Sequence, residues 1–260
     1  MFQDKIIWIT GASSGIGEAL AIALEQAGAR LVLSARRQAE LERVRNSFVA
    51  PEQHMILPLD LADFDAHAAT GAVLERFGHI DVLINSGGVS QRSTVVDTAL
   101  EVDRRIMEIN YFGTVALTKA VLPHMLARKS GQIVAISSVV GKFSTPRRSA
   151  YSASKHALHG FFDALRAEVY SDGVGVLVVC PGYVRTNISL NALTGDGTKH
   201  GQMDRGQEKG LSAEECAAQI TTAMQQRKDE IWIGRERWAI HGKRLFPRLF
   251  NRVMQRVRRS

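Results

Sequence analysis

The stretch ITGASSGIGEALA, from Ile9 to Ala21, connects an apolar segment to the first helical pattern of the chain. Three glycines, Gly11, Gly15 and Gly17, stand between the two with the spacing G-x-x-x-G-x-G. A tight turn from a strand into a helix needs glycine, and a glycine backbone can approach a pyrophosphate closely. The free N–H groups at the start of the helix add the positive end of its dipole. The stretch could be a plain connection, but its place after the first strand favours a dinucleotide phosphate site.

The alternation of strand and helix continues outward from this turn. Short apolar segments that suit buried strands alternate with helix-length segments, the last of which opens with a capping box of Ser212 and Glu215. Strands that are apolar on both faces and separated by helices are typical of a covered parallel sheet. We predict an α/β fold, a single doubly wound Rossmann-type domain whose parallel sheet of about seven strands has helices on both faces. The expected strands are 5–10, 29–35, 54–60, 80–86, 131–138, 173–182 and 230–234, and the expected helices are 15–27, 38–48, 63–77, 98–127, 151–171 and 212–227.

The composition limits the class of protein. The 260 residues are 45% hydrophobic and 23% charged, which is ordinary for a globular protein and excludes disordered and fibrous classes. The start, MFQDKIIWIT, leaves no room for the apolar region of a signal peptide, and no apolar run approaches the ~20 residues of a membrane span. Cys180 and Cys216 lack disulfide or metal spacing, and His156 and His159 have no carboxylate at a metal spacing. We therefore expect a cytoplasmic protein without a metal site, with Cys180 a buried thiol and both histidines in packing or surface roles.

The positive charge of the chain, +7 at pH 7, is concentrated near its end. Residues 235–260 hold nine basic residues against one acid, so the rest of the chain is nearly neutral. After residue 242 an apolar stripe at 245, 246, 249, 250, 253, 254 and 257 faces away from the arginines. This pattern predicts a basic amphipathic helix, which could lie on an anionic membrane, pack on its own body or a sister subunit, or touch nucleic acid. We favour the first two equally and predict no nucleic-acid partner, because the basicity belongs to the tail alone.

The end of the second expected strand indicates which dinucleotide binds. A site that selects NAD places an acid there to hold the ribose 2′-hydroxyl, yet SARRQ at 34–38 has none, and no Asp or Glu occurs between Glu25 and Glu40. Arginine would instead pair with the 2′-phosphate of NADP(H) through charge-assisted hydrogen bonds. We predict NADP(H), with Arg36 the stronger partner and Arg37 the second. The alternative is a solvated arginine pair that opens the next helix.

Two polar residues end the next expected strands, Asp60 the third and Asn85 the fourth. The carboxyl ends of parallel strands face the crevice in which such sheets bind ligands. Both residues are therefore candidates for contact with the adenosine half of the cofactor, although either could serve as a cap.

Tyr151 and Lys155 stand four residues apart on an expected helix, so the two side chains share a face. Hydride transfer to a carbonyl carbon needs a proton moved to or from the oxygen, and an ammonium near a tyrosine favours the phenolate. Such a pair is common by chance, but Ser138 ends an apolar strand upstream, where its hydroxyl could stabilise charge on the substrate oxygen. Ser137 is the neighbouring alternative, although strand alternation points the two in opposite directions.

Taken together, these motifs resemble the short-chain dehydrogenase/reductase family. The matching stretches span roughly residues 5 to 190 in order, and their joint occurrence is far more specific than any single one. They are TGASSGIG at 10–17, LINSGG at 83–88, INYFGT with Asn110, ISSVVGK with Ser138, YSASK with Tyr151 and Lys155, and PGYVRT at 181–186. INSGGVSQRS, VLPHML and SASKHALHGFF look most like the branch that acts on steroids, retinoids and other apolar carbonyls.

The resemblance implies a catalytic tetrad of Asn110, Ser138, Tyr151 and Lys155, in which Asn110 holds a water that links Lys155 to bulk solvent. Lys155 would also reach the ribose of the cofactor, and Thr186 would bond the nicotinamide carboxamide. It further implies a homodimer or homotetramer assembled through the helices at 98–127 and 151–171. The cofactor-binding residues that we predict are Gly11, Ser13, Ser14, Gly15, Ile16, Gly17, Arg36, Arg37, Asp60, Leu61, Asn85, Gly87, Tyr151, Lys155, Pro181, Gly182, Val184 and Thr186.

One motif departs from the family pattern, since Asn-Asn-Ala-Gly is usual where this chain has Asn85-Ser86-Gly87-Gly88. The second glycine loosens the backbone, which puts the fine geometry of this loop in doubt.

The long polar, glycine-rich segment at 186–210 is typical of a functional lid, here over a substrate. We predict an NADP-binding catalytic domain at 1–234 with this lid, followed by a basic extension at 235–260. The expected function is an NADP(H)-dependent oxidoreductase of alcohols and apolar carbonyls, with Tyr151 as general acid/base. A catalytically idle dinucleotide sensor or membrane scaffold is the rival hypothesis.

Overall fold

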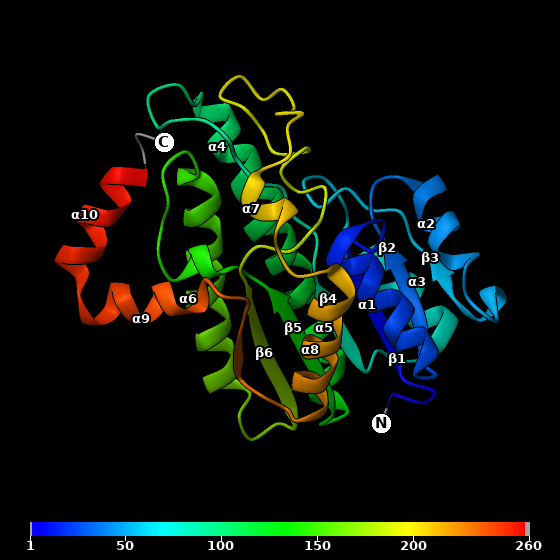
Figure 1. Ribbon diagram of the computed structural model, residues 1–260. Helices are drawn as coiled ribbons and strands as arrows, with labels where there is room; N and C mark the ends of the chain where they lie inside the picture. The colour runs from blue at the N-terminus through cyan, green and yellow to red at the C-terminus, as the bar shows by residue number, and fades with distance from the viewer. Residues whose placement is uncertain (1, 258–260) are drawn as a thin grey trace.

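A seven-stranded parallel sheet with helices on both faces forms the body of the computed structural model, which describes residues 2–257 (Figure 1). The strand order is β3-β2-β1-β4-β5-β6-β7, and each neighbouring pair is parallel. The winding reverses between β1 and β4, which opens a crevice at the carboxyl ends of these strands. The predicted doubly wound α/β fold is confirmed. The strands are β1 (Ile6–Thr10), β2 (Arg30–Ser34), β3 (Met55–Ile56), β4 (Val82–Asn85), β5 (Gly131–Ile136), β6 (Val174–Pro181) and β7 (Glu230–Ile233).

The helices follow the predicted alternation, and the capping box of Ser212 and Glu215 is present at the start of α8. None of the helices between Phe2 and Val257 combines the length and the apolarity that crossing a membrane would need. The α-helices are α1 (Gly15–Gln26), α2 (Gln38–Arg45), α3 (Ala66–Phe77), α4 (Leu100–Met107), α5 (Gly113–Ala127), α6 (Ser149–Glu168), α7 (Arg205–Glu208), α8 (Ala213–Gln225), α9 (Arg237–Leu245) and α10 (Pro247–Val257). Three short turns are also helical: η1 (Pro51–Gln53) and η3 (Val139–Gly141), both 3₁₀, and the π-helical η2 (Glu108–Phe112).

Two apolar cores lie on the two faces of the sheet. Successive strand residues point to opposite faces, so Ile7 and Ile9 join the core beneath α1 and α8, whereas Trp8 joins the core beneath α3, α5 and α6. Helices α1 and α8 lie side by side on the first face (Figure 1). Because both faces are covered, the central strands are completely buried, and they hold the loops at their carboxyl ends in fixed positions.

The third strand is shorter than predicted, because β3 covers only Met55–Ile56 rather than 54–60. The extended backbone continues to pair with the region of β2, since Leu57 N donates to Leu33 O and Leu59 N donates to Ala35 O. Pro58 stands between these two donors, so its missing N–H does not interrupt the bonds to β2, and residues 57–59 pair with β2 as extended backbone outside β3. Asp60 therefore follows an irregular extension, and the prediction that it ends the strand is wrong.

The single helix predicted at 98–127 is divided into α4, η2 and α5. The π-helical turn η2 adds a residue to one turn of the helix, and such turns occur frequently at functional sites. It contains Asn110, whose side chain is completely buried.

The basic amphipathic helix predicted after residue 242 is also divided, into α9 and α10, because Pro247 cannot continue α9 and instead begins α10. Phe250 on α10 packs edge to face against Phe143, with ring centres 5.4 Å apart. The outer side of this helix pair stands away from the sheet (Figure 1). Arg258 and Arg259 of the predicted basic tail lie outside the described residues.

Candidate active site

A cavity of about 930 Å³ opens at the carboxyl ends of the strands and runs from the glycine loop to α9 and α10. The structure brings nearly all of the predicted site residues to its wall. Only Asn85 and Asn110 are not among the lining residues. Those that line it are Gly11, Ser13, Ser14, Gly15, Ile16, Gly17, Arg36, Arg37, Asp60, Leu61, Gly87, Ser138, Tyr151, Lys155, Pro181, Gly182, Val184 and Thr186.

The glycine loop between β1 and α1 requires its glycines. Gly11 and Gly15 have φ angles of 69° and 59°, in the left-handed region that favours glycine. A Cβ at Gly17 would overlap the carbonyl oxygen of Gly11, so the helix can begin this close to the turn only without a side chain. A Cβ at Gly15 would lie 2.9 Å from Thr186 Cγ2 across the cavity. The loop therefore leaves a backbone cradle beside the first N–H groups of α1, as a pyrophosphate site needs.

Arg36 and Arg37 follow β2 and are exposed at the mouth of this cradle. Within residues 2–257 neither makes an ion pair. Glu40, the next acid along the chain, is held by Arg43 at 2.9 Å. The two guanidinium groups are thus available to an anion at the adenosine end of the cavity.

Of the two polar residues predicted to contact the adenosine half of the cofactor, Asp60 lines the cavity and Asn85 does not. Asp60 lines the cavity, accepts a hydrogen bond from Ala62 N at 3.1 Å and faces Arg105 at 3.3 Å. The Asn85 side chain points away from the cavity and donates to Thr118 Oγ1 at 3.2 Å, while its Oδ1 has no hydrogen-bond partner. Asn85 thus ties β4 to α5.

The loop after β4, where the chain has Gly87 in place of the usual alanine, packs directly on the glycine loop. Thr10 Oγ1 accepts hydrogen bonds from Ser86 N and Gly87 N, each at 3.1 Å. A Cβ at Gly87 would overlap the end of the Leu61 side chain. The extra glycine therefore makes room for Leu61, which lines the adenosine side of the cavity.

Asn110 connects two parts of the site from behind the cavity wall. Its Oδ1 accepts from Val89 N at 2.8 Å, and its Nδ2 donates to Val89 O and to Ser154 Oγ at 2.9 and 3.0 Å. A Cβ at Gly88 would lie 3.0 Å from Asn110 Oδ1 and 3.7 Å from Lys155 Nζ. The buried amide thus fixes the loop after β4 against α6, close to the lysine.

Ser138 and Ser137 point in opposite directions, as the strand alternation predicts. Ser138 lines the cavity, its Oγ donates to Pro181 O at 3.2 Å, and the same oxygen accepts from Val140 N at 3.3 Å. Ser137 Oγ instead donates to the carbonyl of Lys155 at 3.2 Å, inside the protein.

Tyr151 lies across the cavity from the glycine loop, in an apolar cluster with Val139, Val140, Phe143 and Ile240. Burial in this cluster raises the pKa of Tyr151, because an apolar environment disfavours the phenolate. The charges of Arg148 and Arg92 and a hydrogen bond with Ser138 act in the opposite direction.

Lys155 lies one turn along α6 and is 5% exposed. Its Nζ donates to the carbonyl of Ile136 at 2.8 Å and lies 5.8 Å from the centre of the Tyr151 ring. Burial lowers the pKa of Lys155 to about 8, since the buried ammonium loses its hydration. Tyrosine, lysine and serine thus meet at one end of the cavity.

Sequence reasoning missed a polar network at this same end. The buried side chain of Gln91 accepts hydrogen bonds from Ala150 N at 2.8 Å and Tyr151 N at 3.4 Å, so it caps the first turn of α6. Arg92 and Arg148 line the cavity, and both bind Asp204. The only signal in the sequence is a polar pair, Gln91-Arg92, within a loop that leads from a buried strand.

The remaining wall at the tyrosine end is mostly apolar. It combines segments that are far apart in the sequence, including α9 and α10. Its apolar members are Val89, Val139, Val140, Phe143, Ile188, Leu193, Ala239 and Met254. Glu236, the single acid of the C-terminal extension, lies against Gly182 and accepts a hydrogen bond from Tyr183 N at 3.3 Å. The extension is thereby attached to the loop after β6.

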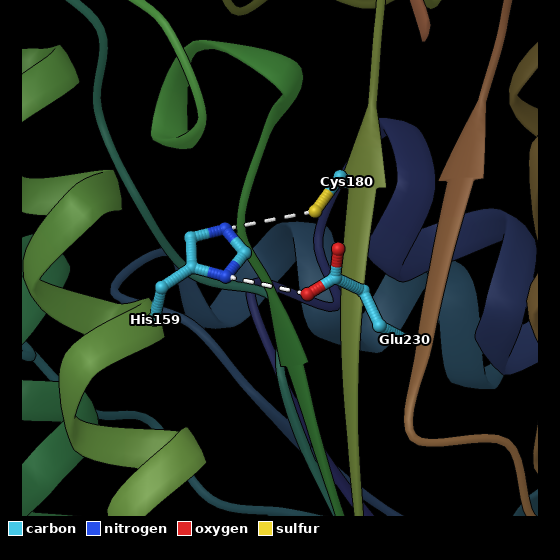
Figure 2. A group of neighbouring side chains, drawn as sticks. All are labelled: His159, Cys180 and Glu230. Carbon is cyan, nitrogen blue, oxygen red and sulfur yellow. Dashed lines mark hydrogen bonds and ion pairs between the residues drawn. The ribbon is translucent and has the colours of Figure 1, made fainter. Parts of the chain in front are cut away.

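A second cluster of reactive side chains, His159, Cys180 and Glu230, lies beneath the site (Figure 2). His159 Nε2 is 3.6 Å from Cys180 Sγ, and Nδ1 is 3.7 Å from Glu230 Oε2, so a different ring nitrogen faces each partner. Glu230 already binds an ammonium, Lys142 Nζ, at 2.7 Å. Burial raises the pKa of the Cys180 thiol and so keeps it protonated. These contacts favour a structural polar cluster over a metal centre.

Comparison with known proteins agrees with this arrangement. Residues 5–196 match the family described as short chain dehydrogenase. The chain is 50% identical over 238 residues to the mosquito (Anopheles gambiae) protein named dehydrogenase/reductase SDR family protein 7-like, which covers 89% of this chain and 75% of that protein. It is 45% identical over 260 residues to mouse (Mus musculus) dehydrogenase/reductase SDR family member 7B, covering 97% and 80% of the two chains.

Solved structures share the fold along nearly the whole chain. A short-chain dehydrogenase from Streptomyces avermitilis superposes with a TM-score of 0.85 at 31% identity, covering 99% of this chain and 98% of that one. A short chain dehydrogenase/reductase from Burkholderia phymatum in complex with NAD gives 0.79 at 26% identity, with 89% of each chain covered. An alcohol dehydrogenase from the archaeon Thermococcus sibiricus, complexed with 5-hydroxy-NADP, gives 0.76 at 26%, covering 89% and 97%. Fold, motifs and relatives agree that this chain belongs to the short-chain dehydrogenase/reductase family.

Proposed function

We propose that the protein is an NADP(H)-dependent oxidoreductase that interconverts an alcohol and a carbonyl compound, with Tyr151 as the general acid/base. The observation that carries this proposal is the meeting of Tyr151, Lys155 and Ser138 at one end of a cavity whose other end is the glycine cradle. The cradle fits a dinucleotide, because a side chain at Gly15 would extend across it to Thr186, and glycine leaves this space open. When bound, the nicotinamide supplies or accepts the hydride.

The residues of the chain then have the following roles. In the reductive direction the Tyr151 hydroxyl gives its proton to the carbonyl oxygen as the hydride reaches the carbon, and the phenolate is reprotonated from solvent. Ser138 donates a hydrogen bond to the same oxygen, which stabilises its developing charge. Lys155 holds the cofactor ribose and favours the phenolate through its positive charge. Asn110 holds the water that links Lys155 to solvent, and Thr186 bonds the carboxamide.

Turnover by the tyrosine variant is the direct test. We expect wild type to oxidise NADPH with one or more members of a panel of apolar ketones and aldehydes, and Tyr151→Phe to lose activity by a factor of about 10²–10⁴. Unchanged cofactor affinity in the variant would show that only the proton transfer is lost. Wild type that binds NADPH and turns over nothing across the panel would instead favour the rival function, a dinucleotide sensor or scaffold.

The choice of NADP(H) over NAD(H) rests on the chain itself, since one related structure contains NAD and another an NADP analogue. Arg36 and Arg37 stand at the adenosine end of the cavity. Asp60 is the acid that lines this region, and it already faces Arg105. A 2′-phosphate would thus meet positive charge without direct opposition from a free carboxylate.

Substrates of this site are apolar carbonyl compounds or alcohols, of the size of steroids or retinoids. The wall at the tyrosine end consists largely of aliphatic and aromatic side chains, and α9 and α10 add Ala239 and Met254 to it. Burial of apolar surface is the main source of affinity in such a pocket. The segment 186–210, which lines the same end, is the proposed lid.

The C-terminal extension, residues 235–260, also contacts an anionic membrane surface. Arginines flank an exposed group of large apolar side chains, here called the outer apolar face. Its members are Trp238, Leu245, Phe246, Leu249 and Val253, between 46% and 67% exposed. The opposite side of α10 packs on the body through Phe250. Insertion of the outer face, with attraction of the arginines to anionic lipid, would give reversible binding.

The protein is further proposed to act in the cytoplasm as a homodimer or homotetramer. Both cysteines are free thiols, which suits a reducing compartment. Phe112, at the start of α5, is half exposed, and it offers an apolar contact on the helices that would form the oligomer interface. Light scattering during gel filtration would give the mass of the assembly, and a monomer would contradict this part of the proposal.

A further inference from the structure

One carboxylate, Asp204, holds two arginines that belong to different parts of the chain. Arg92, in the loop after β4, donates through Nε at 3.0 Å and also through its terminal nitrogen. Arg148, directly before α6, donates at 2.9 Å. Asp204 itself lies in the segment 186–210, so the three side chains join the proposed lid to the loop after β4 and to the helix that carries Tyr151. We call these three residues the arginine latch.

Further contacts hold the two arginines of the latch in place, and the latch carries a charge. Arg92 is 8% exposed and also donates to Ser90 Oγ at 2.8 Å. The guanidinium of Arg148 stacks on the ring of Tyr183 at 5.6 Å. The two arginines outnumber the single carboxylate, so the latch carries a net positive charge. Its three side chains are between 7% and 21% exposed, so solvent screens their charges less than it screens charges on the surface.

Tyr151 lies at the same wall of the cavity. Its backbone is close to Arg148 along the chain and is hydrogen-bonded to Gln91, the neighbour of Arg92. Arg148 is three residues before Tyr151, in the turn that begins α6. Gln91, next to Arg92, accepts the hydrogen bond from Tyr151 N. The backbone of the tyrosine is therefore held close to the segments that carry both arginines.

The charges that face Tyr151 are mostly positive. The side chains around the tyrosine come from α6, from the loop after β4, from the proposed lid and from the segments at η3 and α9. They are Arg148 directly before α6, Lys155 on α6, Arg92 in the loop after β4, Asp204 behind the arginines, the neutral Ser138 directly before η3 and the apolar Ile240 on α9. The negative member of this set, Asp204, reaches the tyrosine only through the arginines that it binds.

We propose that Arg92 and Arg148 are positioning residues of the reaction: they stabilise the ionised form of Tyr151 by their charge, and Asp204 of the lid sets how much of that charge the tyrosine experiences. Closing the lid brings the carboxylate onto the arginines and favours the protonated tyrosine, the form that donates a proton in reduction. Opening it leaves both arginines unneutralised and favours the phenolate. The proposal rests on the proposed role of Tyr151 as general acid/base.

The proposal predicts that removing a positive charge and removing the negative charge of the latch shift the ionisation of Tyr151 in opposite directions. Arg148→Met should raise the pH at which Tyr151 ionises by about 0.5 unit or more, and Asp204→Asn should lower it by a similar amount. Arg148→Lys, which keeps the charge but not the planar geometry, should restore most of the wild-type value. A latch that serves only to hold the structure would shift both variants in one direction or neither.

The ionisation can be measured without turnover. The absorbance of tyrosinate is recorded between about pH 8 and 11, with NADP bound, for each variant and for the same variant carrying Tyr151→Phe. The difference isolates Tyr151 from the other tyrosines, including Tyr183, which touches Arg148. The pH profile of alcohol oxidation by the same variants provides the second readout.

The outcomes separate the two hypotheses. Opposite shifts in the difference titration, with rescue by Arg148→Lys, support the proposal. Equal or same-direction shifts in the two variants overturn it, even if the enzyme turns over normally. Wild type without any alcohol oxidation would count against the proposed function alone, because the titration would still report on the arginines. If Arg148→Met does not fold, Arg92→Met removes the other positive charge and should raise the pH of ionisation in the same way, with Arg92→Lys as its charge-preserving control.

Discussion

Lys155 Nζ and Tyr151 are neighbours across one helical turn, with the nitrogen 5.8 Å from the centre of the tyrosine ring and bonded to the carbonyl of Ile136. The lysine is therefore already directed by the end of β5 towards the cavity. Burial has opposite consequences for the two groups, because it raises the pKa of the tyrosine and lowers that of the lysine to about 8. Both groups are shifted towards their neutral forms, and a bound cofactor and the surrounding charges must act against this tendency.

Arg36→Ala should change the cofactor preference. Loss of a charge-assisted hydrogen bond to the 2′-phosphate is expected to raise the Michaelis constant for NADPH about tenfold or more and to leave that for NADH unchanged. Arg30→Ala is the matched control, because Arg30 is an exposed arginine at the other end of the same strand, paired with Asp4. An NADPH-to-NADH preference that stays at the wild-type ratio in Arg36→Ala would refute the assignment.

Gly17→Ala should weaken cofactor binding and the fold together. The added methyl would overlap the Gly11 carbonyl, and relief requires the backbone of the cradle to move. We expect a loss of about 1–3 kcal/mol in unfolding free energy and a weaker affinity for NADPH in a fluorescence titration. Gly71→Ala, in an open position of α3, is the control and should be neutral or stabilising. Equal behaviour of the two variants would contradict the clash.

Gln91→Met should reduce turnover more than it raises the Michaelis constant for the substrate. It removes the oxygen that caps the first turn of α6 and leaves the N–H groups of Ala150 and Tyr151 without their partner. The expected cost is about 1–3 kcal/mol, seen as a lower melting temperature. The control is Gln219→Met, since Gln219 is an exposed glutamine on α8. A wild-type turnover rate in Gln91→Met would exclude this role.

His159 should make the fold less stable in mild acid. Burial lowers its pKa to about 4, below the ordinary value of 6.5. Between these values the unfolded chain binds a proton that the folded chain does not, so stability falls as the pH is lowered from 6.5 towards 4. His159→Gln should flatten the dependence of the melting temperature on pH over this range, whereas the exposed His67→Gln should not. A slope retained in full by His159→Gln would assign the effect to other groups.

Membrane binding should depend on the outer apolar face. Replacing Leu249 and Val253 together by serine is expected to lower binding to vesicles that contain phosphatidylserine by about tenfold or more, since each side chain loses about 1 kcal/mol of insertion. The control replaces Val95 and Val96 by serine; this pair is more exposed than Leu249 and Val253 but lies far from the extension in sequence. Vesicles of phosphatidylcholine alone should bind weakly. Co-sedimentation equal to wild type would remove the membrane hypothesis.

The sequence was sufficient for the features that depend on local spacing and chain order. The glycines, Tyr151 and Lys155 could be placed because the turn and the helix fix their relative positions within a few residues. The short β3 was not predicted, because the apolar pattern of residues 54–60 indicated one continuous strand whereas only Met55–Ile56 are regular. Asn85 shows the limit of this reasoning: its position at the end of the fourth strand was predicted correctly, but packing against Thr118 decides where its amide points.

The arginine latch could not be predicted from the sequence. Arg92 and Asp204 are separated by 112 residues, and nothing in the local pattern of either stretch indicates a partner. Their meeting depends on how the segment 186–210 crosses the carboxyl ends of the strands. Tertiary structure therefore decides the electrostatics around Tyr151, whereas local sequence decides the identity of the reacting groups.

The sides of α9 and α10 that face the cavity have a consequence for how the substrate range of such an enzyme can change in evolution. The residues proposed for hydride and proton transfer all precede residue 196, within the part matched by the family, yet Ala239 and Met254 complete the wall beside the tyrosine. Changes near the end of the gene could thus alter which molecules fit without disturbing the chemistry. The same arrangement gives a practical warning: a substitution in α9 or α10 would alter the wall of the pocket, and a change in selectivity could be mistaken for a loss of catalysis.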